Sequence, residues 1–266
     1  MSGFHIKAFC GGGKKRELIG HNDKIVIPAS LQKRLEWYQT ILCHPGETKT
    51  EQTIRKHFTW KNLRQQAAHV CGRCHTCQIT KCAKKKYGHL PIKEVEAEPW
   101  EKLCVNLIGP YTIKRPRKKT LTLWCVTMID PATGWFEIKE IHGIDAAAVA
   151  NLVELTWLTR YPRLTQITFD RGTKFMADFA KMVRNDYSIK TKPITTRNPQ
   201  ANSIIERIHQ TIGNMIRTFR MHETEINEND PWRGVLSATM FATRATLHTT
   251  LQASPSQLVF GPVATR

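Results

Sequence analysis

The chain has 266 residues and a formal net charge of +18, from 40 Lys and Arg against 22 Asp and Glu. Its length allows one or two globular domains, and its 41% of apolar residues excludes wholesale disorder. No apolar run is long enough to span a membrane, and residues 1–10 lack the apolar segment of a secretory signal. We therefore expect a soluble protein with a polyanionic partner, above all nucleic acid; an inert basic surface is the plain alternative.

Residues 1–27 are predicted to form an N-terminal extension, with a flexible basic segment at 11–16 and a short strand at 24–28. Residues 28–80 then show three helical patterns, which begin at Ala29, at Thr50 and near Lys61. Thr50 and Thr53 are candidate caps of the second helix. Three short helices bury little apolar surface, so a bound metal would supply the missing stability.

Positive charge is concentrated in the first part of the chain, because residues 1–97 carry 18 Lys and Arg against 7 Asp and Glu. The span 81–99 is polar and basic and is interpreted as a linker. Two short runs there and beyond it are candidate DNA contacts and resemble nuclear-import signals, although solvated loops explain such runs equally well. These candidates are Lys84, Lys85, Lys86, Arg115, Lys118 and Lys119.

From residue 100 to 262 the periodicity changes to that of an α/β domain. Strands are predicted at 102–111, 121–130, 134–141, 165–169 and 188–192, and helices at 145–157, 174–184, 201–221 and 231–247. The turn at 130–134 makes a hairpin of the second and third strands, and Asp145 caps the first of these helices.

Several motifs along the chain together resemble the integrases of retroelements, most of all those of gypsy-type LTR retrotransposons. The motifs are Leu42-Cys43-His44-Pro45-Gly46, Cys74-x2-Cys77, Phe169-Asp170-Arg171-Gly172, Asn198-Pro199-Gln200-Ala201-Asn202 and Glu206-Arg207. The resemblance implies a ribonuclease H-like mixed-sheet core preceded by a small three-helix domain of zinc-binding type. It also implies DNA as the partner, self-association and Arg207 as a further DNA contact. The expected location is the nucleus, or a cytoplasmic particle before import. Because such integrases are cut from polyproteins, the chain is expected to be a fragment or a decayed copy.

The resemblance assigns three zinc ligands, which are His44, Cys74 and Cys77. The family's first histidine, five residues before His44, is replaced by Gln39, and a glutamine amide is a poor zinc ligand. Cys43 and Cys71 are close enough in sequence to complete the set, although Cys43 is awkwardly placed beside His44. The hypothesis is a weakened or rearranged zinc site; a metal-free helical bundle is the alternative.

The same resemblance assigns a catalytic Asp-Asp-Glu set that holds Mg²⁺ or Mn²⁺ for DNA strand transfer. Asp170 and Glu206 are separated by the expected 35 residues, whereas Asn106 stands at the position of the first aspartate. A helix N-cap for Asp170 and a solvated helix face for Glu206 are the structural alternatives. Asp130 is the nearest other strand-end carboxylate, but the turn that follows it explains it better.

Replacing Asp by Asn at position 106 removes a charge from the metal pocket. One charge pair at close range contributes about 4 kcal/mol, and losing it slows a reaction roughly a thousandfold. Lys174, where the family usually has glutamate, adds positive charge nearby. The sequence therefore favours a DNA-binding integrase with impaired catalysis. A non-catalytic DNA- or protein-binding module is the alternative, and a different nuclease of the same fold is disfavoured by the motifs.

Overall fold

The computed structural model describes residues 3–11, 14–80, 98–113, 121–170, 178–194, 213–214, 234–248 and 251–261. These residues form two compact units. The first contains the described residues up to position 80, Asn214 and those from 237 onward. The second contains those from 98 to 213 and those at 234–236.

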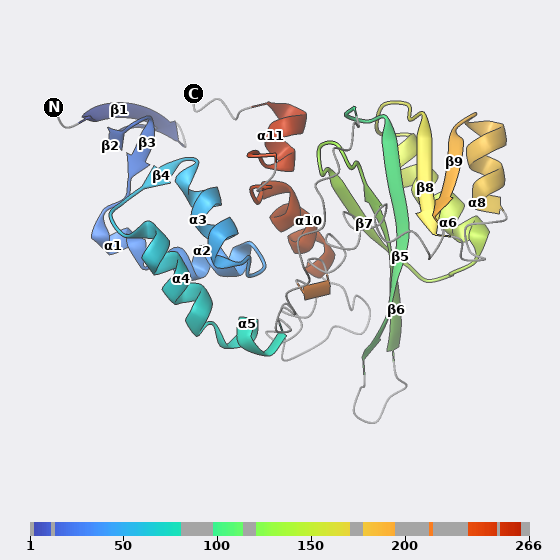
Figure 1. The fold of residues 1–266 in the computed structure, drawn as a ribbon, viewed down its shortest axis with the longest axis horizontal. Coiled ribbons are helices and arrows are strands. Elements are labelled where there is room, and N and C mark those ends of the chain that lie inside the picture. Colours follow the sequence, from blue (N-terminus) through green and yellow to red (C-terminus); the bar gives the residue numbers. More distant parts are fainter. Residues whose placement is uncertain are drawn as a thin grey trace, which may run out of the picture. The chain divides into compact units, whose positions relative to one another are not determined.

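A four-stranded sheet in the order β1-β2-β3-β4 lies in the first unit (Figure 1). Its strands are β1 (Phe4–Gly11), β2 (Lys14–His21), β3 (Lys24–Val26) and β4 (Phe58–Thr59). The first two pair antiparallel as a hairpin, and β3 pairs parallel with β4. The strand near Lys24 is confirmed, but the flexible segment at 11–16 is wrong for its described residues, which belong to β1 and β2. Backbone pairing with the partner strand creates this hairpin, and the basic composition of the segment gives no sign of it.

Five helices complete the N-terminal part of this unit. They are α1 (Ala29–Gln32), α2 (Leu35–Ile41), α3 (Glu47–Arg55), α4 (Leu63–Arg73) and α5 (His75–Thr80). The three predicted helical segments are all helical, but the first is broken after Gln32 and the third is followed by α5. The shared core of α2, α3 and α4 consists of Leu35, Ile54, Leu63 and Ala67.

The predicted capping roles of Thr50 and Thr53 are wrong. Helix α3 already begins at Glu47, with Gly46 at the N-cap position. The Thr50 hydroxyl donates to the Pro45 carbonyl at 3.4 Å, and the Thr53 hydroxyl donates to the Lys49 carbonyl at 2.6 Å. Both threonines therefore lie inside the helix and bond back to the preceding turn, as buried helical threonines commonly do.

Two C-terminal helices belong to the first unit, except for residues 235–236, which cluster with the second. They are α10 (Val235–Ala245), which falls within the predicted 231–247 helix, and α11 (Pro255–Phe260). Ala242 of α10 packs against Cys43 of the N-terminal part. The sequence places both helices in the domain at 100–262, whereas the described residues from 237 onward cluster with the first unit. Contacts between distant segments decide this grouping, and local patterns do not reveal them.

The second unit is built on a mixed five-stranded sheet in the order β7-β6-β5-β8-β9 (Figure 1). Its strands are β5 (Lys102–Ile113), β6 (Leu121–Ile129), β7 (Phe136–Ile141), β8 (Gln166–Asp170) and β9 (Lys190–Ile194). The first three pair antiparallel. Strand β8 pairs parallel with β5, and β9 pairs parallel with β8. The predicted hairpin of β6 and β7 and all five predicted strands are confirmed.

Helix α6 (Ala146–Val153) continues into the π-helical turn η1 (Glu154–Leu158), and α8 (Asp178–Lys181) continues into the π-helical turn η2 (Met182–Asp186). The predicted cap is confirmed, since the Asp145 carboxylate accepts from the Ala148 N–H at 2.8 Å. The fully buried Trp157 and Phe169 anchor the core of this unit. Within the described residues no helix is long and apolar enough to cross a membrane.

Candidate metal centre and degenerate catalytic site

Three of the four residues assigned to zinc lie together in the first unit. The Nδ1 atom of His44 and the Sγ atom of Cys74 are 3.2 Å apart. One ligand atom from each of His44, Cys74 and Cys77 lies within 4.8 Å of the other two. The structure therefore gathers these residues from the loop after α2, the end of α4 and helix α5.

A sharp turn after α2 places the histidine. Cys43 and His44 both have left-handed backbone conformations, with φ of 53° and 56°. The His44 N–H donates to the Gln39 carbonyl at 2.9 Å, which closes the end of the helix. Two consecutive left-handed residues reverse the chain direction, and His44 is buried as a result.

The geometry of this cluster fits zinc at three positions. In a tetrahedral site with Zn–S bonds near 2.3 Å, neighbouring ligand atoms are roughly 3.8 Å apart. The 3.2 Å between His44 and Cys74 and the limit of 4.8 Å on all three separations are compatible with this value. Bound zinc would cross-link the loop after α2 to α4 and α5, and so stabilise a domain with a small core.

Gln39, the fourth position assigned to zinc, is not arranged as a zinc ligand. The Gln39 side chain directs its Nε2 amide towards two sulfurs, that of Cys71 at 3.1 Å and that of Cys77 at 3.9 Å. An amide NH₂ group donates hydrogen bonds and has no electron pair available for a cation. Gln39 therefore stands beside the candidate ligands as a hydrogen-bond donor.

Of the two cysteines that the sequence leaves open, Cys43 faces elsewhere. Its side chain is buried against Ala238 and Ala242 of α10. Burial raises the pKa of the Cys43 thiol to about 11, which keeps it protonated near neutral pH. It behaves as a small apolar side chain of the helical core.

Two of the three positions assigned to catalysis, 106 and 170, lie within the described residues of the second unit. Asn106 lies on β5 and Asp170 ends β8, and these strands pair parallel up to Val105 opposite Phe169. One further step in that register sets position 106 beside position 170. Glu206 and Lys174 lie outside the described residues. The fold thus brings together the backbone of two assigned positions, and one of them is an asparagine.

Local contacts engage the polar groups of Asn106. Its side-chain Oδ1 accepts from the Leu107 N–H at 2.9 Å, and its backbone carbonyl accepts from the Thr127 hydroxyl at 3.2 Å. A neutral amide oxygen that already accepts a hydrogen bond is a weaker ligand for a divalent cation than a carboxylate. The side chain at this position thus supplies no charge to hold Mg²⁺ or Mn²⁺.

Asp130 does not replace the missing carboxylate. Its Oδ2 accepts from the Thr133 hydroxyl at 2.6 Å and from the Trp100 N–H at 3.3 Å, and its Oδ1 accepts from the Ala132 N–H at 3.0 Å. The side chain is completely buried in the turn between β6 and β7. The interpretation of Asp130 as a turn residue is confirmed.

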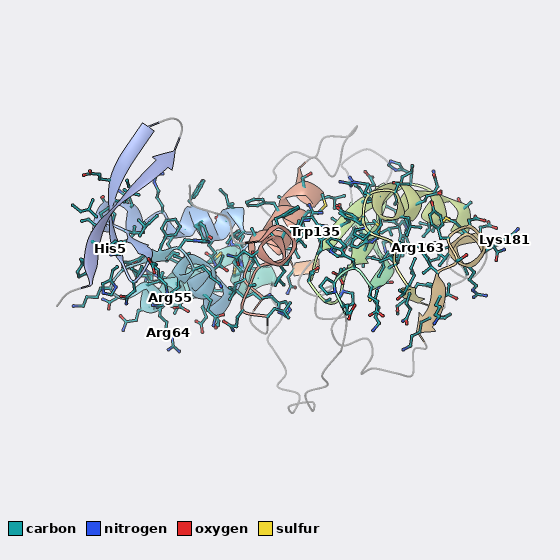
Figure 2. All side chains as sticks on the ribbon, turned by 90° about the horizontal axis from the view of Figure 1, so that it is seen from above. His5, Arg55, Arg64, Trp135, Arg163 and Lys181 are labelled. Carbon is teal, nitrogen blue, oxygen red and sulfur yellow. The ribbon has the colours of Figure 1, made fainter. Side chains whose placement is uncertain are left out.

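The residues assigned to DNA contact, including Arg207, all lie outside the described residues. Elsewhere, both units carry exposed cationic side chains. Figure 2 labels Arg55 and Arg64 on the first unit, and Arg163 and Lys181 on the second. The positive charge of the chain is therefore present on the surface of each unit, and sequence motifs gave no sign of these four positions.

Comparisons with known proteins agree with this geometry. Residues 28–82 match the family model of the integrase zinc binding domain. The chain is 24% identical over 218 residues to the retrovirus-related Pol polyprotein from transposon 412 of Drosophila melanogaster, and 24% identical over 248 residues to the transposon Tf2-3 polyprotein of Schizosaccharomyces pombe.

The chain is thus similar to retroelement polyproteins and, over residues 28–82, to integrase zinc binding domains. The two alignments cover 82% and 91% of the chain, but it spans only 17% and 18% of the length of these polyproteins. Among solved structures, it resembles a chain of the simian T-cell lymphotropic virus intasome in complex with PP2A regulatory subunit B56 gamma. That match has a TM-score of 0.56 and 13% identity, and it covers 86% of this chain and 73% of that one. The fold is therefore a ribonuclease H-like mixed-sheet core preceded by a helical domain of zinc-binding type.

Proposed function

We propose that the chain is an integrase-derived DNA-binding protein of the gypsy-type LTR retrotransposon branch, in which strand transfer is impaired. The observation that carries this proposal is the placement of Asn106 on β5, one register step beyond the pairing of β5 with β8 and beside Asp170. An integrase needs its first aspartate on this strand. The asparagine keeps the shape of that side chain and lacks its charge.

Strand transfer is the attack of a DNA hydroxyl on a phosphodiester, and Mg²⁺ or Mn²⁺ would supply the activation of the attacking oxygen. In this proposal Asp170 and Glu206 contribute the remaining carboxylates, and Asn106 contributes one neutral oxygen. Its Oδ1 is already engaged by the Leu107 N–H. Losing one charge pair at close range costs about 4 kcal/mol at an effective dielectric of 20, which is roughly a thousandfold in rate.

Duplex DNA is the proposed partner. Support comes from the net charge of +18, the exposed cations on both units and the resemblance of the fold to a chain of a viral intasome. Self-association and action in the nucleus belong to the same proposal, because integration joins DNA ends to a chromosome. Phosphate contacts would make this binding weaken steeply with salt.

A strand-transfer assay with Mg²⁺ or Mn²⁺ tests the proposal on the full chain. The unaltered protein should join DNA ends slowly or not at all, and Asn106→Asp should raise the rate by roughly a thousandfold. Asn151→Asp is the matched control, because Asn151 is an exposed residue of α6 and the change adds the same charge away from the site. DNA affinity, measured in parallel by fluorescence anisotropy, should be present in all three proteins.

The outcomes separate the two candidate functions. Recovery of strand transfer in Asn106→Asp but not in Asn151→Asp supports an integrase site that a single side chain impairs. DNA binding without recovery, even with Lys174→Glu and Gln39→His added, supports a non-catalytic binding module. Rapid strand transfer by the unaltered chain contradicts the proposed impairment.

A further inference from the structure

A third sulfur, that of Cys71, lies close to the residues of the metal cluster in the first unit. Cys71 lies in the last turn of α4, three residues before Cys74, which is the C-cap residue of that helix. The Cys71 thiol lies 3.8 Å from the Thr50 hydroxyl and 3.7 Å from the Pro45 carbonyl, to which it donates. Pro45 directly follows the ligand candidate His44, so Cys71 touches the loop that carries the histidine.

The Gln39 amide connects this sulfur to the rest of the cluster. Its Nε2 contacts Cys71 at 3.1 Å and Cys77 at 3.9 Å, so both sulfurs lie next to one NH₂ group. A structural zinc site uses four ligands, and Cys₃His is one of the common sets. Three residues supply suitable atoms, whereas Gln39 turns its amide nitrogen, which is no metal ligand, towards the sulfurs.

We propose that Cys71 provides the fourth zinc ligand and that the site is Cys₃His, formed by His44, Cys71, Cys74 and Cys77. The proposal requires the Cys71 Sγ to leave its contact with Pro45 and join the cluster; a change of χ1 between staggered rotamers moves a cysteine sulfur by about 3 Å. On binding, each thiol releases its proton to solvent and its sulfur forms a bond to the metal. Cys43 is excluded because it packs against α10.

Gln39 has a defined part in this arrangement. Three thiolates and Zn²⁺ leave a net negative charge on the site, and N–H donors to metal-bound sulfur stabilise such charge. The Gln39 NH₂ group is already placed for Cys71 and Cys77. The pair of Gln39 and Cys71 thus replaces the family's first histidine. The inference stands apart from the proposed function, since it concerns only the stability of the first unit.

Metal binding by the full chain tests the proposal. The metal-free protein is titrated with Zn²⁺ against a chromophoric chelator, and with Co²⁺ to record the absorption band of thiolate-to-cobalt charge transfer. Cys71→Ser should weaken zinc binding on the order of a hundredfold and lower the cobalt band by about one third, because two thiolates remain instead of three. Cys43→Ser is the matched control and should change neither quantity.

A second pair of variants, made in the Gln39→His protein, tests whether Cys71 binds zinc or only supports the fold. In Gln39→His the fourth ligand is the histidine, so adding Cys71→Ser to that variant should cost little zinc affinity. X-ray absorption of the unaltered zinc-bound protein needs no variant and should show three sulfurs and one nitrogen. Two sulfurs in that spectrum, an unchanged cobalt band in Cys71→Ser, or an equal loss of affinity in both backgrounds would overturn the proposal.

Discussion

The hydroxyl oxygen of Thr53 accepts a hydrogen bond of 3.1 Å from the backbone N–H of Leu247, 194 positions further along the chain. Both residues are buried. The same hydroxyl donates to the Lys49 carbonyl one turn back in α3, so a single oxygen joins the N-terminal helices to the segment after α10. This bond and the packing of Ala242 on Cys43 tie the end of the chain to the first unit.

Thr53→Val should destabilise the first unit by about 1–3 kcal/mol, because it leaves the buried Leu247 N–H without an acceptor. Thr40→Val is the matched control. Thr40 makes the same bond to a carbonyl four residues back, at 3.0 Å, but it is exposed and serves no distant donor. Urea denaturation gives the free energy of unfolding, and the hydrogen-exchange rate of the Leu247 amide shows whether its hydrogen bond is lost. Equal losses in both variants would contradict the role assigned to Thr53.

Asp130→Ala should destabilise the second unit by about 3 kcal/mol, since the N–H groups of Trp100 and Ala132 and the Thr133 hydroxyl lose their acceptor. Asp186→Ala removes an exposed carboxylate and should change the free energy of unfolding by less than about 0.5 kcal/mol. Urea denaturation followed by tryptophan fluorescence measures both. A loss no larger than that of the control would mean that the turn does not need this carboxylate.

Local chemistry made Asp130 and Asp145 predictable from the sequence. In the turn Asp-Pro-Ala-Thr-Gly, Asp130 accepts from Ala132 and Thr133, and Asp145 accepts from Ala148, so these bonds form within three residues. The further bond to Asp130 from the Trp100 N–H comes from 30 residues away. The strands of the second unit were predictable for a similar reason, because their apolar residues follow in short runs bounded by turns. Thr50 and Thr53 have the right residue type for caps, but Gly46 begins the helix one turn earlier.

Long-range pairing explains what the sequence did not reveal. The strands β1 and β2 form through their mutual backbone bonds. Helix α10 joins the first unit through its contact with Cys43, and the segment after it through the bond from Leu247 to Thr53. At the metal cluster, the sequence identified Gln39 as a departure from the family but not the direction of its amide. That direction depends on where the fold places the sulfurs of Cys71 and Cys77.

We expect the buried thiol of Cys104 to lower the free energy of unfolding at alkaline pH. Burial, with the nearby Asp130 charge, raises the pKa of this thiol from 9.0 to about 12. Below pH 9 the thiol is neutral in both states and the folded form keeps its full stability. As the pH rises from 9 towards 12, the unfolded chain ionises and the folded one does not, so this thiol lowers the free energy of unfolding by up to about 1.4 kcal/mol per pH unit.

Cys104→Ala removes the titrating thiol at this position and leaves the other titratable groups of the chain in place. The free energy of unfolding, measured at several values between pH 7 and 11, should fall less steeply above pH 9 in the variant than in the unaltered chain. The comparison uses the slopes, because the smaller alanine also lowers stability at every pH. Parallel curves would show that the thiol does not titrate differently in the folded and unfolded states.

The salt dependence of DNA binding tests which charges meet the phosphates, and it rests on the proposed DNA-binding function. Each neutralised phosphate contributes about 0.9 to the slope of log affinity against log salt on duplex DNA. If the linker run contacts DNA, the triple variant Lys84→Ala, Lys85→Ala and Lys86→Ala should reduce that slope by roughly 2 to 3. Fluorescence anisotropy at a series of salt concentrations measures the slope.

A second triple variant removes the same charge from exposed positions of the first unit, with Lys33, Lys56 and Lys61 each changed to alanine. Its slope should stay near that of the unaltered chain, because only cations held against phosphates release counterions. Equal reductions in both variants would mean that the charge of +18 acts diffusely, and that the linker run makes no contacts of its own. An unchanged slope in the linker variant alone would exclude the run from the interface and direct attention to the other exposed cations, such as Arg55 and Arg64.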